Sequence, residues 1–390
     1  MSEWKTISAD VFCDSVRDGT HDTPKQVEKG YKLVTAKHIN NGQVDLSDAY
    51  LISEQDYLKI NERSKVEQWD VLMSMIGNGL GKSAVVKDNP EYAIKNLALF
   101  KLGDEIKAKW LHYYLSSKAG QGFIYNSLQG SGQPFISLSL LRKFPIPVPN
   151  DETIMGDVVT VLSRYDSLIE NYQKQIKLLE EAAQRLYKEW FIDLRFPGHE
   201  NTKIVDGVPE GWEKKKLIDI AKLKAGGDKP EVFSKEKTSE LKVPIFSNGT
   251  INDGLYGYTD IAEINDPCVT ISARGSVGYT VLRRKPFVPI VRLISVIPSN
   301  VYVGYLYFFI KGMPIESNGA AQQQITVPMI KNKVVIIPPD IILNFFKEKE
   351  EFYFSVIENY KEQILYLSEA RDRLLPKLMS GDFDERIVVN

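Results

Sequence analysis

The segment Gly77–Ser83 (Gly-Asn-Gly-Leu-Gly-Lys-Ser) contains the residue types that hold nucleotide phosphates. A phosphate-binding loop has the spacing G-x-x-x-x-G-K-[ST], which requires glycine at the position that Ile76 occupies here. Such a loop also opens a helix, whose first amides bind the anion, whereas the apolar residues after Ser83 favour a strand. We therefore predict a glycine hairpin, and a nucleotide-dependent enzyme remains an alternative.

Other catalytic and metal-binding patterns are incomplete. Ile337–Asp340 lacks the flanks of an adenine-methyltransferase loop, and no Gly-x-Ser-x-Gly segment is present for acyl transfer. Cys13 and Cys268 lie far apart with no Cys-x-x-Cys spacing, and the four histidines fit no metal motif. We therefore expect no catalytic residue, no metal site and no cofactor in this chain.

Two loops rich in amide side chains and glycine are suited to contacts with DNA bases. They are Gln129–Gln133 and Asn318–Gln324. Gln and Asn can bond adenine through two hydrogen bonds, and glycine lets a backbone approach closely. A solvated loop is the alternative for each. The candidate DNA-contacting residues are Lys37, His38, Asn40, Gln129, Ser131, Gln133, Ser247, Asn248, Arg274, Asn318, Gln322 and Gln323. The basic runs 214–216 and 283–285 are weaker candidates for phosphate contacts.

The chain repeats itself. Ser167–Leu186 aligns with Ser355–Leu374 without a gap, and about 12 of 20 positions are identical. The two amide-rich loops stand at matching places upstream of these segments. The sequence therefore predicts two copies of one unit, each with a globular part followed by a helix.

Both helices carry apolar residues at alternating steps of three and four, which is typical of a coiled-coil seam. The seam residues are Ile169, Tyr172, Ile176, Leu179, Leu186 and Trp190 in the first copy, and Ile357, Tyr360, Ile364, Leu367 and Leu374 in the second. We expect Asp151 and Asp340 to cap the helices, with ends at Phe196–Gly198 and Ser380–Gly381. Because one chain has both stripes, we expect the helices to pack against each other, antiparallel, about a pseudo-twofold axis.

The expected fold class is α+β, with two domains of one fold joined by two long antiparallel helices. Short strands are predicted at 71–76, 83–86, 268–272 and 291–297, and short buried helices at 109–117 and 304–310. The expected boundaries are 1–150 for the first globular domain, 151–196 for the central helix, 197–338 for the second globular domain, 339–380 for the C-terminal helix and 381–390 for the tail.

The composition is that of an ordinary soluble protein. The chain has 390 residues, 43% hydrophobic and 26% charged, and a formal net charge of -2. No stretch reaches the ~18 apolar residues of a membrane helix, so we expect a cytoplasmic protein without a membrane partner. The charge argues against a protein that binds DNA alone through bulk electrostatics, but not against positive charge gathered on two local surfaces.

The doubled unit, the junction Arg185–Phe191, the segment Gly207–Trp212 and the ending Arg371–Gly381 resemble the specificity (S) subunit of type I restriction-modification systems. Arg17–His21 (Arg-Asp-Gly-Thr-His) and Thr35–Gly42 also look like family segments, although the second copy has no Arg-Asp-Gly-Thr-His. The resemblance covers nearly the whole chain.

The resemblance implies that each globular part reads one half of a bipartite site in double-stranded DNA, while the helices set the spacer and dock two modification (methyltransferase) subunits. Those partners would bring S-adenosylmethionine for adenine N6 methylation. Restriction (endonuclease and translocase) subunits would bring ATP and Mg. The alternative from another class is a coiled-coil scaffold with two protein-binding heads and no DNA specificity.

Overall fold

The computed structural model describes residues 4–130, 134–314 and 324–381. The chain forms two compact units, and the boundary between them lies inside its two long helices. Unit 1 is Met1–Gln173 with Glu362–Asn390, and unit 2 is Lys174–Lys361. Each unit contains sheets and helices, which confirms the α+β class. No helix in the described part of the chain is long and apolar enough to cross a membrane.

Unit 1 is built on two sheets. The larger sheet is antiparallel with the order β2-β10-β7-β8, and the smaller has the order β6-β3-β9 with β3 and β9 parallel. The larger sheet consists of β2 (Ser15–Asp18), β7 (Val71–Ser74), β8 (Ser83–Val85) and β10 (Leu97–Lys101). The smaller consists of β3 (Tyr31–Val34), β6 (Leu51–Ile52) and β9 (Tyr92–Ile94).

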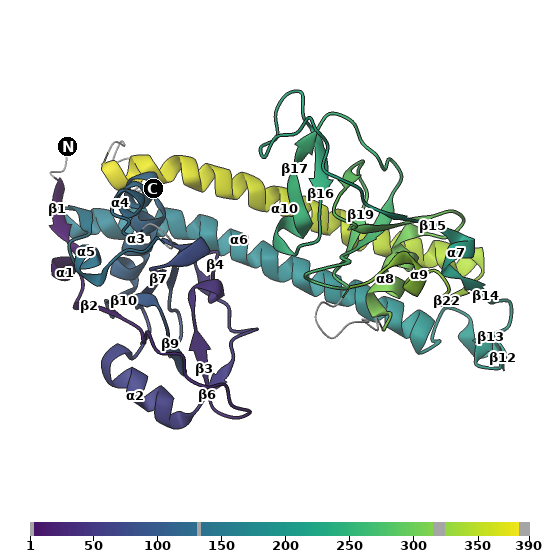
Figure 1. The fold of residues 1–390 in the computed structure, drawn as a ribbon, viewed down its shortest axis with the longest axis horizontal. Coiled ribbons are helices and arrows are strands. Elements are labelled where there is room, and N and C mark those ends of the chain that lie inside the picture. Colours follow the sequence, from purple (N-terminus) through teal and green to yellow (C-terminus); the bar gives the residue numbers. More distant parts are fainter. Residues whose placement is uncertain (1–3, 131–133, 315–323, 382–390) are drawn as a thin grey trace. The chain divides into compact units, whose positions relative to one another are not determined.

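Short strands and helices complete unit 1 (Figure 1). The pairs are β1 (Trp4–Ser8) with β11 (Pro145–Pro149) and β4 (Ile39–Asn40) with β5 (Gln43–Val44). The helices are α1 (Ala9–Phe12), α2 (Glu54–Ser64), α3 (Glu105–Ser116), α4 (Lys118–Asn126) and α5 (Leu138–Arg142). The apolar faces of α1, α3, α4 and α5 form one core with the larger sheet, around the fully buried Trp110, Phe100 and Phe144, whereas α2 packs on the smaller sheet through Ile60.

Unit 2 has the same sheet plan. Its sheets have the orders β15-β21-β18-β19 and β17-β16-β20, with β16 and β20 parallel, and β14 pairs with β22 as β1 does with β11. The strands are β14 (Glu213–Lys216), β15 (Ala221–Ala225), β16 (Val243–Phe246), β17 (Leu255–Thr259), β18 (Cys268–Ile271), β19 (Thr280–Arg283), β20 (Val288–Pro289), β21 (Ile294–Pro298) and β22 (Val334–Ile337). The remaining elements are β12 (Ile204–Val205), β13 (Val208–Pro209), α7 (Leu217–Ile220), α8 (Val303–Gly312) and α9 (Val327–Ile330).

An equivalent hydrogen bond joins the same helix and strand within each copy. The Trp110 indole on α3 donates to the Pro147 carbonyl on β11, at 2.9 Å, and the Tyr305 hydroxyl on α8 donates to the Ile336 carbonyl on β22. The sheet order, the parallel pair and this anchor recur although most side chains differ. The predicted internal repeat is therefore confirmed.

The long helices are α6 (Glu152–Tyr187) and α10 (Asp340–Ser380), drawn in teal and yellow in Figure 1. The Asp151 carboxylate caps α6 as expected, because it accepts from the Thr153 hydroxyl and from the Thr153 backbone amide, the latter at 2.9 Å. These two hydrogen bonds lower the pKa of Asp151. The expected cap at Asp340 is wrong, because α10 already includes this residue and the carbonyl of Pro339 accepts the first helical hydrogen bonds.

The end of α6 also differs from the expectation. The α-helix stops at Tyr187, a π-helical turn covers Lys188–Ile192, and Leu194 has a φ of +57°. The turn places Trp190 and Phe191 together in the aromatic core of unit 2, where both rings contact Phe346 of α10. Packing of neighbouring aromatic residues thus ends the regular helix before the Pro-Gly signal is reached.

Within each unit, α6 and α10 pack together and run antiparallel. In unit 1, the start of α6, at Val158 and Leu162, shares a core with Leu378 near the end of α10. In unit 2, the end of α6, at Ala183 and Tyr187, packs with the start of α10. The predicted helix pairing is confirmed in this form.

The short predicted elements are found close to their expected positions, with one exception. The segment 291–297 was expected to be a strand, but β21 begins at Ile294. Val291 and Arg292 instead have φ values of +54° and +61° and form a turn. Their amides bond the carbonyls of Gly227 and Gly226, at 2.9 Å each, so this turn is required to meet the end of β15.

Candidate nucleic-acid interface

Three loops of unit 1 meet at one edge of its sheets, and we name this place the three-loop edge. The loops are 35–44 after β3, 76–82 between β7 and β8, and 128–136 before α5. The amide of Ile136 donates to the carbonyl of Met75 at 3.0 Å, which joins the third loop to the second. The sequence-predicted candidates of the first copy therefore lie on neighbouring loops.

Loop 35–44 contains three of the candidates, and they are not equivalent. The His38 side chain is buried, its Nδ1 accepts from the Thr35 amide at 2.8 Å, and burial lowers the pKa of this imidazole. Lys37 and Asn40 are exposed; Lys37 pairs with Asp48 at 2.8 Å, and Asn40 donates to the Lys37 carbonyl. His38 is thus placed to hold the loop, whereas Lys37 and Asn40 lie on its surface.

Loop 76–82 is a glycine hairpin, as predicted. Gly77 and Gly81 have φ values of +81° and +82°, and Ser83 begins strand β8 rather than a helix. The loop therefore does not open a helix as a phosphate-binding loop does, which removes the main support for nucleotide binding by Gly77–Ser83. The side chain of Gln121 on α4 donates to the Gly81 carbonyl at 3.1 Å and holds the hairpin against the helices.

Loop 128–136 contributes one candidate that can be placed. Gln129 is exposed, and its backbone amide and backbone carbonyl both bond the backbone of Phe135. Ser131 and Gln133 lie outside the described residues.

Unit 2 brings together the equivalent loops, of which the first is 247–254 after β16, the second is 272–279 between β18 and β19, and the third precedes α9. The amide of Ile325 donates to the Ala273 carbonyl at 3.0 Å, which reproduces the bond between Ile136 and Met75 in unit 1. Exposed Arg274 lies 3.5 Å from the Gln324 side-chain oxygen, between the second and third loops. Asn318, Gln322 and Gln323 lie outside the part of the chain that the structure describes.

Two candidates on the first loop of unit 2 are half-buried. Asn248 accepts from the Ala273 amide and donates to the Val291 carbonyl, at 2.6 Å each, so both ends of its amide bind backbone. Ser247 bonds the Gly254 carbonyl through its own amide, at 2.8 Å. Asn248 therefore ties two loops together through its side chain, whereas Ser247 is held through its backbone.

The basic run 283–285 is largely used inside the protein. Arg283 is buried, its guanidinium lies 3.6 Å from the centre of the Phe246 ring, and burial lowers its pKa to about 10. Arg284 pairs with the buried Glu350 at 2.9 Å. Two of these three cations are therefore committed to contacts within unit 2. The run 214–216, by contrast, is exposed on β14.

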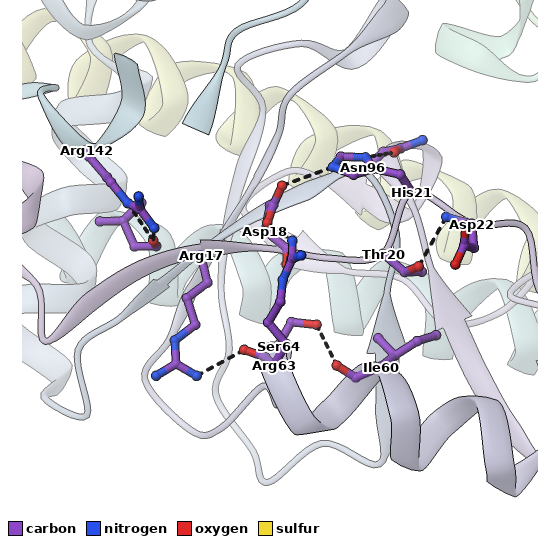
Figure 2. A network of polar contacts seen from close by, with 11 residues as sticks. Arg17, Asp18, Thr20, His21, Asp22, Ile60, Arg63, Ser64, Asn96 and Arg142 are labelled. Carbon is purple, nitrogen blue, oxygen red and sulfur yellow. Dashed lines mark hydrogen bonds and ion pairs between the residues drawn. The ribbon is translucent and has the colours of Figure 1, made fainter. Parts of the chain in front are cut away.

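The Arg17–His21 segment turns at the same sheet end, and Figure 2 shows its contacts. The largely buried Asp18 carboxylate accepts from Arg63 of α2 with one oxygen and lies 3.1 Å from His21 Nε2 with the other. His21 Nδ1 is 2.9 Å from the side-chain oxygen of Asn96. Asp18 thus connects the end of β2, helix α2 and the turn between β9 and β10.

The second copy keeps the glycine of this segment but not the carboxylate. A Cβ atom on Gly19 would lie 2.3 Å from the Ile94 carbonyl oxygen, and one on Gly226 would lie 2.6 Å from the Pro289 carbonyl oxygen. The position of Asp18 is taken by Ala225. The glycine is therefore a backbone requirement of the fold, and the carboxylate network is particular to unit 1.

Replacing Asp18 by asparagine is expected to lower the free energy of unfolding of unit 1 by about 1–2 kcal/mol, because a neutral amide must then face Arg63 or His21 with a donor. Urea unfolding measures the effect. Asp22→Asn is the matched control, since Asp22 is exposed and its backbone amide donates to the Thr20 hydroxyl, whereas its carboxylate has no partner among the described residues. Equal stability of the two variants would contradict the role of Asp18 as a connecting group.

Ten of the eleven proposed seam residues lie on α6 or α10, Trp190 lies in the π-helical turn that follows α6, and none of the eleven is exposed. Ile169, Trp190 and Ile357 are buried; the half-buried ones are Tyr172, Ile176, Leu179, Leu186, Tyr360, Ile364, Leu367 and Leu374. The same helices carry a second set of apolar residues, which is exposed and was not predicted by the seam spacing. It comprises Leu168, Leu178, Ile341, Phe345, Phe352, Leu365 and Tyr366.

Metal-binding and thiol chemistry find little support in the described residues. No group of three or more His, Cys, Asp and Glu side chains among residues 4–130, 134–314 and 324–381 could hold a metal ion. Cys13 and Cys268 are buried free thiols, and burial raises the pKa of each to about 12. Neither thiol is therefore a ready nucleophile near neutral pH.

Comparison with known proteins supports one family. The profile of the family described as "Type I restriction modification DNA specificity domain" matches residues 1–181 and 209–348. The "Type I restriction enzyme MjaIX specificity subunit" of Methanocaldococcus jannaschii is 31% identical over 302 residues, which cover 72% of this chain and 70% of that protein. The "Putative type I specificity subunit S.MpnORF507P" of Mycoplasma pneumoniae is 26% identical over 383 residues, which cover 94% and 96%.

A solved structure has the same fold. The crystal structure of the type I restriction-modification system S subunit from M. genitalium aligns with a TM-score of 0.54 and 17% sequence identity, over 97% of this chain and 96% of that chain. The profile match spans both copies of the repeat, and the relatives extend over most of the sequence. The chain therefore belongs to the family of type I restriction-modification specificity subunits, which are non-catalytic.

Proposed function

We propose that each unit reads one half of a split double-stranded DNA target through its three-loop edge. The observation that supports this most directly is the repeated backbone bond, from Ile136 to Met75 in unit 1 and from Ile325 to Ala273 in unit 2. The same bond presents different loop side chains, as two readers of different half-sites require. Target-recognition domains at 1–150 and 197–338 follow from this assignment.

Within this proposal, the candidates have different roles. Lys37, Asn40, Gln129 and Arg274 are exposed and available for contacts with base edges or phosphates. His38 and Asn248 position the loops, because their polar atoms bind backbone groups of the protein. The unplaced candidates of the third loops keep the role that their residue types suggest.

The helices set the spacer between the half-sites and dock two modification subunits. Leu178 on α6 and Tyr366 on α10 are exposed, at 63% and 54%, and they occupy equivalent positions of the repeat. A repeat that presents an exposed apolar residue at the same position in both copies suits two identical partners.

The partners supply the chemistry. The modification subunits bind S-adenosylmethionine and methylate adenine N6, and restriction subunits add ATP- and Mg-dependent translocation and cleavage. The contribution of this chain is to bring the modification subunits to one sequence.

The test is a map of methylated adenines in a host genome with and without the gene for this chain, with its modification partner expressed in both. Loss of one split motif is expected when the gene is removed. A coiled-coil scaffold predicts no change and no sequence-selective retention of DNA by the assembled complex. An unchanged map in the presence of active modification subunits would therefore contradict the proposal.

A further inference from the structure

A cleft of about 700 Å³ lies within unit 1, beside the three-loop edge. Its walls are the hairpin residues 41–43, strand β8, helix α3 with the start of α4, and the facing parts of α6 and α10. A Cβ atom on Gly42, whose φ is +76°, would lie 3.0 Å from the Nε2 atom of His112 on α3. The hairpin therefore packs closely on α3, and the cleft begins where the first reading loop ends.

The cleft has an excess of positive charge. Five cations line it, Lys82, Lys87, Lys109, Lys118 and Arg371, against three carboxylates, Asp166, Glu170 and Asp372. Each carboxylate has a cationic neighbour, and two of them share Arg371. Arg371 lies 2.8 Å from Asp166 and 2.9 Å from Asp372, and Lys87 pairs with Glu170.

Two lysines of the cleft are left over. Lys109 pairs with Glu105 at 2.7 Å, but the side-chain ammonium groups of Lys82 and Lys118 have no hydrogen-bond or ion-pair partner among the described residues. Both are exposed. Lys82 belongs to the glycine hairpin of the three-loop edge, and Lys118 begins α4. The unpaired charge therefore lies at the side of the cleft that adjoins the loops.

The rest of the lining suits an anion with many oxygen atoms rather than a protein surface. Serine hydroxyls line it from three helices, at Ser116, Ser163, Ser167 and Ser368. Burial lowers the pKa of His112 to about 4, so this imidazole is neutral and adds no charge at pH 7. Among the residues that the structure describes, none of the large exposed apolar side chains lines the cleft, whereas protein interfaces are centred on such residues.

We propose that the cleft binds the phosphate backbone of the DNA whose bases are read at the three-loop edge, and that Lys82 and Lys118 are its phosphate contacts. The proposal rests on the proposed function. Phosphate contacts fix the register of a reader on the duplex without selecting the sequence. A cleft continuous with the reading loops provides such contacts next to the first half-site.

The test uses the full chain assembled with its modification subunits. Lys82→Gln, Lys118→Gln and the double variant are compared with Lys59→Gln, which removes an exposed lysine of α2 outside the cleft. The dissociation constant is measured from 50 to 200 mM salt for the cognate duplex and for one with a scrambled first half-site. Each cleft variant is expected to weaken both duplexes by the same factor and to reduce the salt slope by about 0.9, or about 1.8 in the double variant.

Between 50 and 200 mM salt, the dissociation constant of a variant that has lost one phosphate contact should therefore rise by a factor about three times smaller than that of the wild type. An unchanged slope in the double variant, with the wild-type complex preferring its cognate duplex, would overturn the inference and leave the proposed function intact. Loss of modification subunits from the variants, with the slope retained, would assign the cleft to a protein partner instead. If Lys82→Gln removes only the cognate preference, this lysine reads bases. A wild-type complex with no preference would contradict the proposed function itself.

Discussion

Replacing Arg284 by methionine is expected to lower the free energy of unfolding of unit 2 by about 2–3 kcal/mol at pH 7, because it strands a buried carboxylate. Glu350 on α10 has 0% of its side chain exposed, and both of its oxygens lie 2.9 Å from the Arg284 guanidinium. The Tyr302 hydroxyl also donates to it. We place the loss at the lower end for buried pairs, since the Arg284 side chain is 33% exposed. Urea unfolding of the chain measures it.

Two variants separate the ion pair from the packing. Arg284→Met combined with Glu350→Leu is expected to recover most of the loss, because apolar residues of similar size often replace a buried ion pair without cost. Lys285→Met, at the exposed neighbouring position, is expected to change the stability by less than about 0.5 kcal/mol. If Arg284→Met is as stable as Lys285→Met, the pair does not anchor α10 to the sheet domain.

The loss should depend on pH with a definite sign. Burial raises the pKa of Glu350 above its usual value, while Tyr302 and Arg284 oppose the shift. Folding therefore favours the protonated carboxyl, and this stabilisation decreases as the pH rises through the raised pKa. Removal of Arg284 raises the pKa further. The difference between wild type and Arg284→Met should therefore be small near pH 4 and grow towards pH 7, and a constant difference would contradict this account.

The repeat and the long helices could be predicted from the sequence because their signals are local. The seam advances by three and four residues, so its phase is visible within a few turns, and positions such as Ile169 and Ile357 are buried in the structure. The end of α6 was not predictable in this way. The π turn at Lys188–Ile192 follows from packing of Trp190 and Phe191 with a ring on α10, more than a hundred residues away.

The candidate interface was predictable at the level of loops and less so at the level of side chains. Glycine and amide residues predict the loops at matching places in both copies. Within each unit, the structure brings the loops of that unit together. Whether a polar side chain faces solvent depends on partners that no short pattern contains. The partner of Arg284 is 66 residues away in the chain, and Asn248 bonds Val291, 43 residues away. The cleft was missed for the same reason, since its walls come from six separate elements.

The second large effect is expected from lengthening the helices between the two units. We expect that four residues inserted after Gln173 in α6 and four after Lys361 in α10, at the boundary between the units, leave both half-sites unchanged and lengthen the spacer. Four helical residues add about 6 Å. Base pairs are about 3.4 Å apart, so the spacer should grow by about one or two base pairs. A methylation map of a host that expresses the variant with its modification subunits measures the change.

Rotation decides between insertions of similar length. Four residues turn an α-helix by about 400°, which is about 40° beyond a full right-handed turn, whereas three residues stop about 60° short of one. DNA turns right-handed by about 35° per base pair, so the four-residue insertion rotates in the direction that a longer spacer requires and the three-residue insertion rotates against it. We therefore expect methylation of a lengthened site with four added residues and strongly reduced methylation with three. Equal activity of both variants would show that the helices do not fix the angle between the readers, and altered half-sites would show that they do not act as a spacer at all.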